Sequence, residues 1–303
     1  MTDMQLTKTI LSASRRTDIP AFYMEWFMAG IEKGVFEVLN PFNQQRREVP
    51  VRPHQIHSII FWSKNFGPFL HEGFDRRLQD SGYHLFFNFT INSANPVLEP
   101  HVPPLAERLR QMATLARRHD PEAITWRFDP ICFFRTSKGG PLRHNLDDLE
   151  TIADAAAGLG IRRCITSFAD LYRKVRLRLP AKGLKLMDPP MDVKFKTLSK
   201  MAAKLRERNI TLAVCCEQEI VDAFPTASGL HSAACIPGPL LARLFGPDLT
   251  IKKDPGQRRA AGCTCNIAVD IGSYRWHPCY HNCLFCYANP QPPNLPPVGR
   301  KRP

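Results

Sequence analysis

The sequence lacks any run of residues that could cross a membrane. No stretch of about 18 consecutive apolar residues, the length of a spanning helix, occurs in the 303-residue chain. Residues 1–9 are largely polar where a secretory signal would need an apolar run. We therefore expect a cytoplasmic protein without a membrane partner.

Cysteine is absent from the first part of the chain, before Cys132. Ten cysteines follow, and half of them fall between Cys263 and Cys286. Clustering of this kind is typical of a metal site rather than of the disulfide framework of a secreted protein.

The short motifs of common hydrolases are missing as well. No GxSxG, HExxH or P-loop spacing occurs, and no short segment pairs two carboxylates for acid–base chemistry. A barrel enzyme that uses Asp129, Asp170 and Glu217 for ordinary acid–base or hydrolytic chemistry, with purely structural cysteines, is therefore an alternative without a motif in its favour.

Positive charge, by contrast, is plentiful. The formal net charge of +13 suits nucleic acid or an anionic small molecule as a partner. The basic residues are spread along the chain in pairs such as Arg15-Arg16 and Arg46-Arg47, so a solvated basic surface explains most of them.

Short apolar runs rich in β-branched and aromatic residues alternate with amphipathic stretches along residues 10–235. This alternation is typical of βα units and predicts an α/β fold, a partial or complete parallel (β/α) barrel of six to eight strands. Strands are expected at 9–13, 56–62, 84–90, 124–128, 164–168 and 211–216, with a weaker one at 233–236. Helices are expected at 21–33, 68–79, 105–118, 146–159, 194–208 and 218–226.

Three parts follow from this pattern. Residues 1–250 are expected to form the barrel domain, and residues 251–290 a cysteine-rich segment that packs over the barrel mouth. Residues 291–303 are rich in proline and basic residues and are predicted to be a disordered tail.

Polar and charged residues follow nearly every predicted strand. Because the loops after the strands of a parallel barrel lie on one face and build its active site, we expect these side chains to share one pocket. The leading candidates for catalytic roles are Arg15, Arg16, Asp18, Lys64, Arg127 and Asp129. Weaker members of the same set are Asn65, Asn92, Asp170, Glu217 and Glu219. Each also has an ordinary explanation, such as a helix cap for Asp18.

The strongest chemical signal is HPCYHNCLFCYANP, in which Cys279, Cys283 and Cys286 have the spacing CxxxCxxC. Three thiolates on one short loop can ligate three irons of a [4Fe–4S] cluster and leave the fourth iron open. An open iron can chelate S-adenosylmethionine, whose reductive cleavage releases a 5′-deoxyadenosyl radical. Structural zinc is the alternative for these cysteines.

A second group of cysteines precedes this motif. Cys263 and Cys265 form a CxC pair and Cys235 lies upstream, so these three could hold a second iron–sulfur cluster or zinc with one more ligand. The CxC pair could instead share a zinc ion with two of the later cysteines, or remain as free thiols. The cysteines in apolar strand contexts are interpreted as small buried hydrophobic residues, namely Cys132, Cys164, Cys215 and Cys216. Hydrogen bonding around the cluster, rather than ligation, is expected of His277 and His281.

The spacing CxxxCxxC, with Phe285 before the last cysteine, resembles the cluster motif of the radical S-adenosylmethionine superfamily. More broadly, the chain resembles the DUF1848 family over residues 10–289. The segments that carry this resemblance are SASRRTDIPAFY, NPFN, FWSKN, LEP, WRFDPI, SFADLYRK, CTCNIAVDIGSY and HNCLFCYAN. The family is of unknown function, so this second resemblance implies no particular reaction.

Two features depart from the superfamily pattern. Most of its members carry the three cysteines after the first barrel strand, whereas here they lie near the C-terminus. A terminal loop folded back over the barrel mouth would still place a cluster beside the strand ends. FWSKN stands where a GGE-like segment would follow the second strand, so ligands for the methionine moiety cannot be assigned.

These features predict a radical S-adenosylmethionine-type iron–sulfur enzyme that acts on an anionic substrate. The resemblance implies a small electron donor such as flavodoxin or ferredoxin. The alternative is a zinc- or cluster-stabilised protein that binds or modifies nucleic acid, which the net charge and the basic tail favour.

Overall fold

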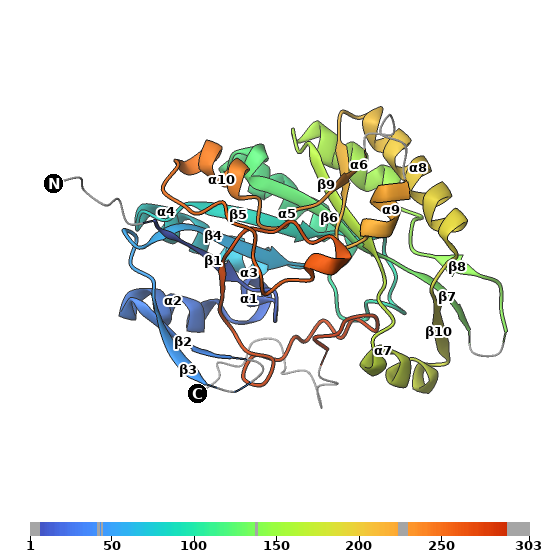
Figure 1. Cartoon of the computed structure of the whole chain (residues 1–303), viewed down its shortest axis with the longest axis horizontal. Helices are drawn as coiled ribbons and strands as arrows, with labels where there is room; N and C mark the ends of the chain where they lie inside the picture. The colour runs from blue at the N-terminus through green and yellow to red at the C-terminus, as the bar shows by residue number, and fades with distance from the viewer. Residues whose placement is uncertain (1–6, 41–42, 44, 137–138, 224–229, 290–303) are drawn as a thin grey trace.

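Eight parallel strands form the main sheet of the protein (Figure 1). The computed structural model describes residues 7–40, 43, 45–136, 139–223 and 230–289. The strands are β1 (Thr9–Ala13), β4 (Ile56–Ser63), β5 (Leu85–Thr90), β6 (Ile124–Ile131), β9 (Arg163–Phe168), β11 (Thr211–Val214), β12 (His231–Ser232) and β13 (Val269–Asp270). Their order across the sheet is β12-β11-β9-β6-β5-β4-β1-β13, and each neighbouring pair is parallel.

The expected α/β fold with a large parallel sheet is confirmed, but a closed barrel is not found. Within the described residues, β12 and β13 share no ladder, so the sheet has two open edges. The first six predicted strands coincide with observed ones to within three residues at either end. The seventh predicted strand, at 233–236, is observed slightly earlier in the chain as β12 at His231–Ser232. Strand β13 was not predicted, because only two of its residues pair with a neighbouring strand.

Ten α-helices connect and cover these strands within the described part of the chain. They are α1 (Ile19–Phe22), α2 (Met24–Lys33), α3 (Gly67–His71), α4 (Phe74–Asp80), α5 (Leu105–Arg118), α6 (Leu149–Gly158), α7 (Arg173–Arg178), α8 (Met191–Arg206), α9 (Gln218–Ala223) and α10 (Gly238–Phe245). The predicted helix at 68–79 is broken at Gly73, which adopts a left-handed conformation (φ 65°). Patterning missed α7, which is short and mostly basic, and α10, which begins with Gly-Pro.

Two small antiparallel sheets flank the main one. The hairpin of β2 (Val35–Leu39) and β3 (Arg46–Pro50) follows α2. A three-stranded sheet joins β10 (Leu184–Met187), β7 (Phe133–Thr136) and β8 (Arg143–His144). These strands were not predicted, because they interrupt the βα alternation. No helix in the described residues is long and apolar enough to span a bilayer.

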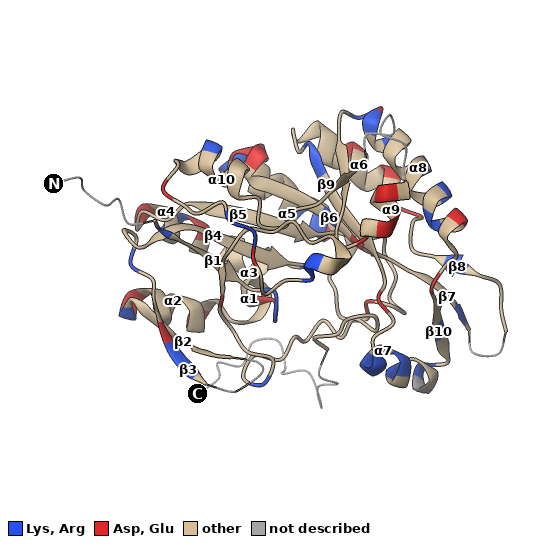
Figure 2. Cartoon of the chain, in the orientation of Figure 1, with Lys and Arg blue, Asp and Glu red and all other residues tan. Residues whose placement is uncertain are grey.

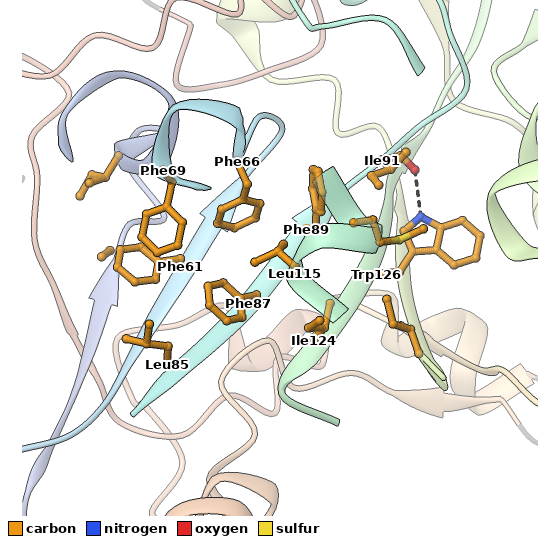
Figure 3. Packing of buried hydrophobic residues seen from close by; sticks show 14 of the residues in the cluster. Phe61, Phe66, Phe69, Leu85, Phe87, Phe89, Ile91, Leu115, Ile124 and Trp126 are labelled. Atoms are coloured by element: carbon orange, nitrogen blue, oxygen red, sulfur yellow. Dashed lines mark hydrogen bonds between the residues drawn. The ribbon is translucent and has the colours of Figure 1, made fainter. Parts of the chain in front are cut away.

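The two faces of the main sheet bury different sets of side chains, because successive residues of a strand point to opposite faces. On one face, Phe61, Phe87 and Trp126 pack against helical residues such as Phe69 and Leu115 (Figure 3). The rings of Phe61 and Phe69 lie 5.0 Å apart, and the Trp126 indole donates to the Ile91 carbonyl oxygen (2.9 Å). Apolar and aromatic packing on this face fixes the sheet on which the loops stand.

The opposite face carries a smaller apolar cluster. Ile10, Ile60 and Phe86 point to this side and pack with Leu241 of α10. Four cysteines belong to the same cluster, namely Cys215, Cys235, Cys263 and Cys265. Cysteines that are far apart in the sequence are therefore brought to one face of the sheet.

Candidate functional site

A cavity of about 780 Å³ lies where the carboxyl ends of the parallel strands meet the C-terminal segment. Its lining includes residues that directly follow β1, β4, β9 and β11, and residues within β6. The predicted site residues that line it are Arg15, Arg16, Asp18, Lys64, Arg127, Asp129, Asp170, Cys235, Cys263, Cys265, Cys279, Cys283 and Cys286. One cavity therefore joins the charged strand ends and both cysteine groups.

Residues 279–289, which we call the thiol loop, cross over the strand ends. The Leu284 amide donates to the Leu98 carbonyl oxygen (2.9 Å), in the segment after β5. The Tyr23 hydroxyl donates to the Pro278 carbonyl oxygen (2.6 Å) just ahead of the loop. These contacts place the loop on the face of the sheet where the expected active site lies.

Arg178 of α7 holds the thiol loop from the other side. Its guanidinium donates to the carbonyl oxygens of Leu284 (3.1 Å), Cys286 (3.1 Å) and Asn289 (2.8 Å), with a longer contact to Cys283 (3.5 Å). The side chain is buried, and burial lowers the pKa of its guanidinium. A buried cation surrounded by carbonyl oxygens fixes the backbone path of the three cysteines.

Asp18 connects the thiol loop to the first two strands. One carboxylate oxygen accepts from the Ala21 amide (3.0 Å) and the Ser63 hydroxyl (2.7 Å). The other accepts from the Lys64 amide (2.8 Å) and from Nε2 of His281 (2.7 Å). With all four partners in place, Asp18 is a positioning residue that caps α1 and holds the loop. The proton for His281 Nε2 is assigned from its carboxylate partner.

Lys64 lies beside the thiol loop with a buried carboxylate as its partner. Its ammonium donates to Glu99 (2.6 Å) and lies 5.5 Å from the ring centre of Phe285. Burial acts to lower the pKa of Lys64, but the Glu99 carboxylate and the Cys283 sulfur raise it by more. The Cys283 thiol contacts the same Glu99 carboxylate at 4.0 Å. Lys64 therefore provides a permanent positive charge next to a cysteine sulfur.

Among the three cysteines of the loop, Cys283 is buried, and Cys279 and Cys286 are partly buried. Burial is the largest cause that raises the pKa of each of Cys279, Cys283 and Cys286, and the neighbouring sulfur of Cys286 raises the pKa of the first two further. As free groups they are therefore protonated at neutral pH. Binding to a soft metal would remove those protons, since the thiolate is the form that ligates.

A second set of thiols lines the same cavity. We call Cys215, Cys216, Cys235, Cys263 and Cys265 the thiol ring. The Cys215 sulfur lies 3.7 Å from the sulfurs of both Cys216 and Cys235. Cys263 and Cys265 complete the group, because they lie in the same buried cluster as Cys215 and Cys235 and line the same cavity. The CxC pair therefore combines with Cys215, Cys216 and Cys235, and not with the thiol loop.

Arg127 and Asp129 belong to β6 and lie beside the ring. The Arg127 guanidinium donates to the Cys235 sulfur (2.7 Å) and forms an ion pair with Asp129. Asp129 also accepts from the Ser167 hydroxyl (2.5 Å). Hydrogen bonds from Cys215 and Cys265 lower the pKa of the Cys235 thiol most, and the Arg127 charge lowers it further.

Arg15 and Arg16 have different surroundings. Arg15 pairs with Asp270 (3.1 Å) and more loosely with Asp254 (3.7 Å), while its Nη1 is buried without a hydrogen-bond partner among the described residues. Arg16 donates to the carbonyl oxygens of Leu39 (3.2 Å) and Gly272 (3.1 Å). Arg15 is therefore a better candidate than Arg16 to bind an anion in the cavity.

Several weaker candidates have structural roles. Glu217 accepts from the Phe168 amide (2.9 Å), and Asp170 pairs with Arg258 (2.6 Å) at the rim. Asn92 joins the Glu99 and Asp129 segments. The residues of the set that do not line the cavity are Asn65, Asn92, Glu217 and Glu219.

Sequence reasoning missed four residues of this site: Glu99, Arg178, Cys215 and Cys216. Glu99 lies in the LEP segment of the family resemblance, which was a usable signal. Arg178 stands in a basic stretch that resembles a solvated surface. Cys215 is buried in an apolar cluster, as expected, whereas Cys216 is only partly buried. The contact of Cys215 with Cys235 was not predicted, because strand context does not reveal neighbours that arrive from distant segments.

The donor set of the thiol loop fits an iron–sulfur cluster. Three soft sulfur donors from one loop face the cavity, and no carboxylate or imidazole lies between them in sequence except His281, which is bonded to Asp18. As they stand, no three or more His, Cys, Asp or Glu side chains in the described residues are arranged to hold a single metal ion. The three cysteines would hold the cluster, with Lys64 and Glu99 beside it.

Comparisons with known proteins identify the family and little else. No curated protein matches this chain. Among solved structures, a D-hydantoinase from Bacillus sp. AR9 is similar at 13% identity and a TM-score of 0.32, over 59% of this chain. The match spans 39% of the length of that enzyme and carries no argument about fold or function.

The family model described as "Domain of unknown function (DUF1848)" matches residues 10–288. The match includes the strand ends around the cavity, the thiol ring and nearly all of the thiol loop. The resemblance found in the sequence is therefore confirmed over most of the chain. The protein belongs to the DUF1848 family.

Proposed function

We propose that the protein is a radical S-adenosylmethionine-type iron–sulfur enzyme acting on a small anionic substrate. One observation carries the proposal: the three thiols of the loop face the same cavity as the charged residues at the strand ends. A [4Fe–4S] cluster on three cysteines supplies an open iron for S-adenosylmethionine and an electron for its reductive cleavage.

The residues around the cavity support this assignment by excluding water and ordering the loop. Trp62, Phe168 and Phe285 give the cavity apolar walls, which suit chemistry that water would quench. Arg178 and Asp18 hold the loop from two sides, so the three sulfurs keep their positions. Arg15 lines the cavity and its Nη1 has no hydrogen-bond partner among the described residues, so we infer that this guanidinium binds a carboxylate or phosphate of the substrate.

The topology is compatible with the expected partial barrel. From β1 to β12 the strands follow each other in chain order, and β13 adds beside β1. This is the cyclic order of an eight-stranded (β/α) barrel with one open seam, between β12 and β13. We infer a partial barrel whose mouth is covered by the thiol loop.

The surface beside the loop suits an acidic electron donor such as flavodoxin or ferredoxin. Figure 2 shows α7 as a strongly basic element. Arg173, Lys174 and Arg176 are exposed on it, while Arg178 of the same helix contacts the loop. A donor attracted by these charges would arrive close to the three thiols.

Anaerobic reconstitution with iron and sulfide tests the proposal directly. The reconstituted chain, given S-adenosylmethionine and a reductant, should produce 5′-deoxyadenosine. The Cys283→Ala variant should lose this activity and the iron of the site, while Cys164→Ala, which removes a buried cysteine outside both thiol groups, should keep both. A colourless protein with zinc at the loop and affinity for nucleic acid would instead establish the alternative function.

A further inference from the structure

We propose that the thiol ring binds a single thiophilic metal ion of the Zn²⁺ kind through Cys215, Cys235, Cys263 and Cys265. This second metal site is separate from the thiol loop and does not depend on the reaction performed there. Its ligands come from three places in the chain: the end of β11, the segment after β12 and the CxC pair before β13.

The distance between two of the four sulfurs, those of Cys215 and Cys235, matches that of ligands on one tetrahedral ion. With metal–sulfur bonds of about 2.3 Å and a tetrahedral angle, two sulfurs on the same ion lie about 3.8 Å apart. The Cys215 sulfur lies 3.7 Å from that of Cys235. Ligands on different irons of a cubane cluster are separated by more than this, so the contact favours a single ion.

Burial selects four ligands from the five thiols. Cys215, Cys235, Cys263 and Cys265 are all buried, whereas Cys216 is only partly buried. Four thiolates complete the shell of a structural zinc ion, which keeps no open position. The four buried cysteines therefore form the ligand set, and Cys216 lies beside it.

The negative charge of such a site would be partly balanced by Arg127, which contacts one of the ligands. Four thiolates around a divalent ion carry a net charge of about −2, which is costly to bury. Arg127 donates to the Cys235 sulfur at 2.7 Å, and its side chain is itself buried. A guanidinium that hydrogen bonds to a ligand sulfur compensates part of this charge and fixes the ligand.

The sulfurs of the ring do not converge on one point in this structure. In accord with this, no three His, Cys, Asp or Glu side chains among the described residues are arranged to hold a metal ion. The Cys215 sulfur instead contacts the sulfurs of Cys216 and Cys235. We infer that an ion draws the four buried thiols inward by rotation about their Cα–Cβ bonds. Four metal–sulfur bonds form, and each thiol that still carries a proton releases it to solvent as its sulfur binds the ion.

Metal analysis of the full chain, expressed with added zinc and purified anaerobically, tests the site. We expect about one zinc per chain, in addition to any iron bound by the thiol loop. The double variant Cys235→Ala/Cys265→Ala should lose the zinc and keep the iron. The Cys283→Ala variant should do the reverse, which separates failure of this site from failure of the proposed function. Cys164→Ala is the matched control and should keep both metals.

Cobalt substitution of the unmodified chain provides a measurement that does not depend on whether a variant folds. Co²⁺ in the ring should give the intense charge-transfer and d–d absorption of a tetrahedral thiolate site, unchanged in Cys216→Ala. The site is overturned if the unmodified chain binds no zinc and shows no such cobalt spectrum. Zinc that persists in the double variant, or iron and sulfide bound by the ring in place of a single ion, would equally refute it.

Discussion

The thiol loop and the thiol ring face the same cavity but are built in opposite ways. The loop takes its three cysteines from residues 279–286, and contacts from Arg178 and Asp18 hold it on the sheet. The ring collects its cysteines from residues 215–265, and their contacts exist only because β11, β12 and β13 are ordered on the sheet. A metal at the loop orders a short segment, whereas a metal at the ring connects distant parts of the fold.

The largest expected effect is on global stability, and it should separate the two groups. A zinc ion that bound the ring of the folded chain and not the unfolded chain would stabilise the fold by about 4 kcal/mol at a free concentration a thousand times its dissociation constant. We expect Cys235→Ala/Cys265→Ala to lower the free energy of unfolding by about this amount in anaerobic urea titrations with zinc present, and Cys283→Ala to lower it by less.

Cys164→Ala calibrates this measurement, since it removes a buried cysteine that belongs to neither group. It should cost about 1 kcal/mol from lost packing alone. If the double variant and Cys283→Ala lost the same free energy of unfolding, the two thiol groups would not differ in how they stabilise the fold.

Arg178→Ala should be the next largest change and should act on the loop alone. The substitution leaves the carbonyl oxygens of Leu284, Cys286 and Asn289 without their buried donor. We expect a cost of about 3 kcal/mol and faster hydrogen exchange across residues 279–289. Arg176→Ala, on an exposed position of the same helix, is the matched control. Zinc at the ring should stay bound in both variants.

Asp18→Asn tests the other support of the loop. The amide nitrogen that replaces one carboxylate oxygen cannot accept from two of the four present donors, which are Ala21 N, Ser63 Oγ, Lys64 N and His281 Nε2. We expect a loss of about 2 kcal/mol in urea titrations, with reduced iron loading at the loop. Glu25→Gln, an exposed acidic residue at the start of α2, should change stability by less than about 0.5 kcal/mol.

The smallest effect concerns pH and a part of the sheet remote from both thiol groups. Burial, and then the nearby His84 and Lys8, lower the pKa of His57 below its ordinary 6.5, although the Gly246 carbonyl oxygen accepts from its Nε2 (2.8 Å). Below pH 6.5 the unfolded chain therefore binds more protons than the folded one, and stability falls as the pH decreases.

Urea titrations between pH 7.5 and about 5.5 measure this decline. The His57→Gln variant should show a shallower decline than the unmodified chain, with unchanged metal content at pH 7.5. An identical slope in the two proteins would assign the pH dependence to other groups.

The successes and failures of sequence reasoning follow the range of the interactions involved. Strands β1, β4, β5 and β6 were predicted well because their continuous apolar runs report burial on both faces, as in Ile56–Ser63. The seam between β12 and β13 was not predictable, since short strands with two paired residues each carry no periodic signal. Helix α10 was missed because it has only eight residues and begins with Gly-Pro.

At the site, the sequence by itself determined the thiol loop and the strand-end residues, since both depend on spacing over a few residues. CxxxCxxC allows three sulfurs to share one loop, and a parallel sheet puts its polar strand ends on one side. Only the tertiary structure decided that Asp18 supports the loop, that Arg178 holds it, and that Cys215 joins Cys235. Those contacts join residues 20 to 263 positions apart, and packing of the whole sheet, which no local pattern encodes, brings them together.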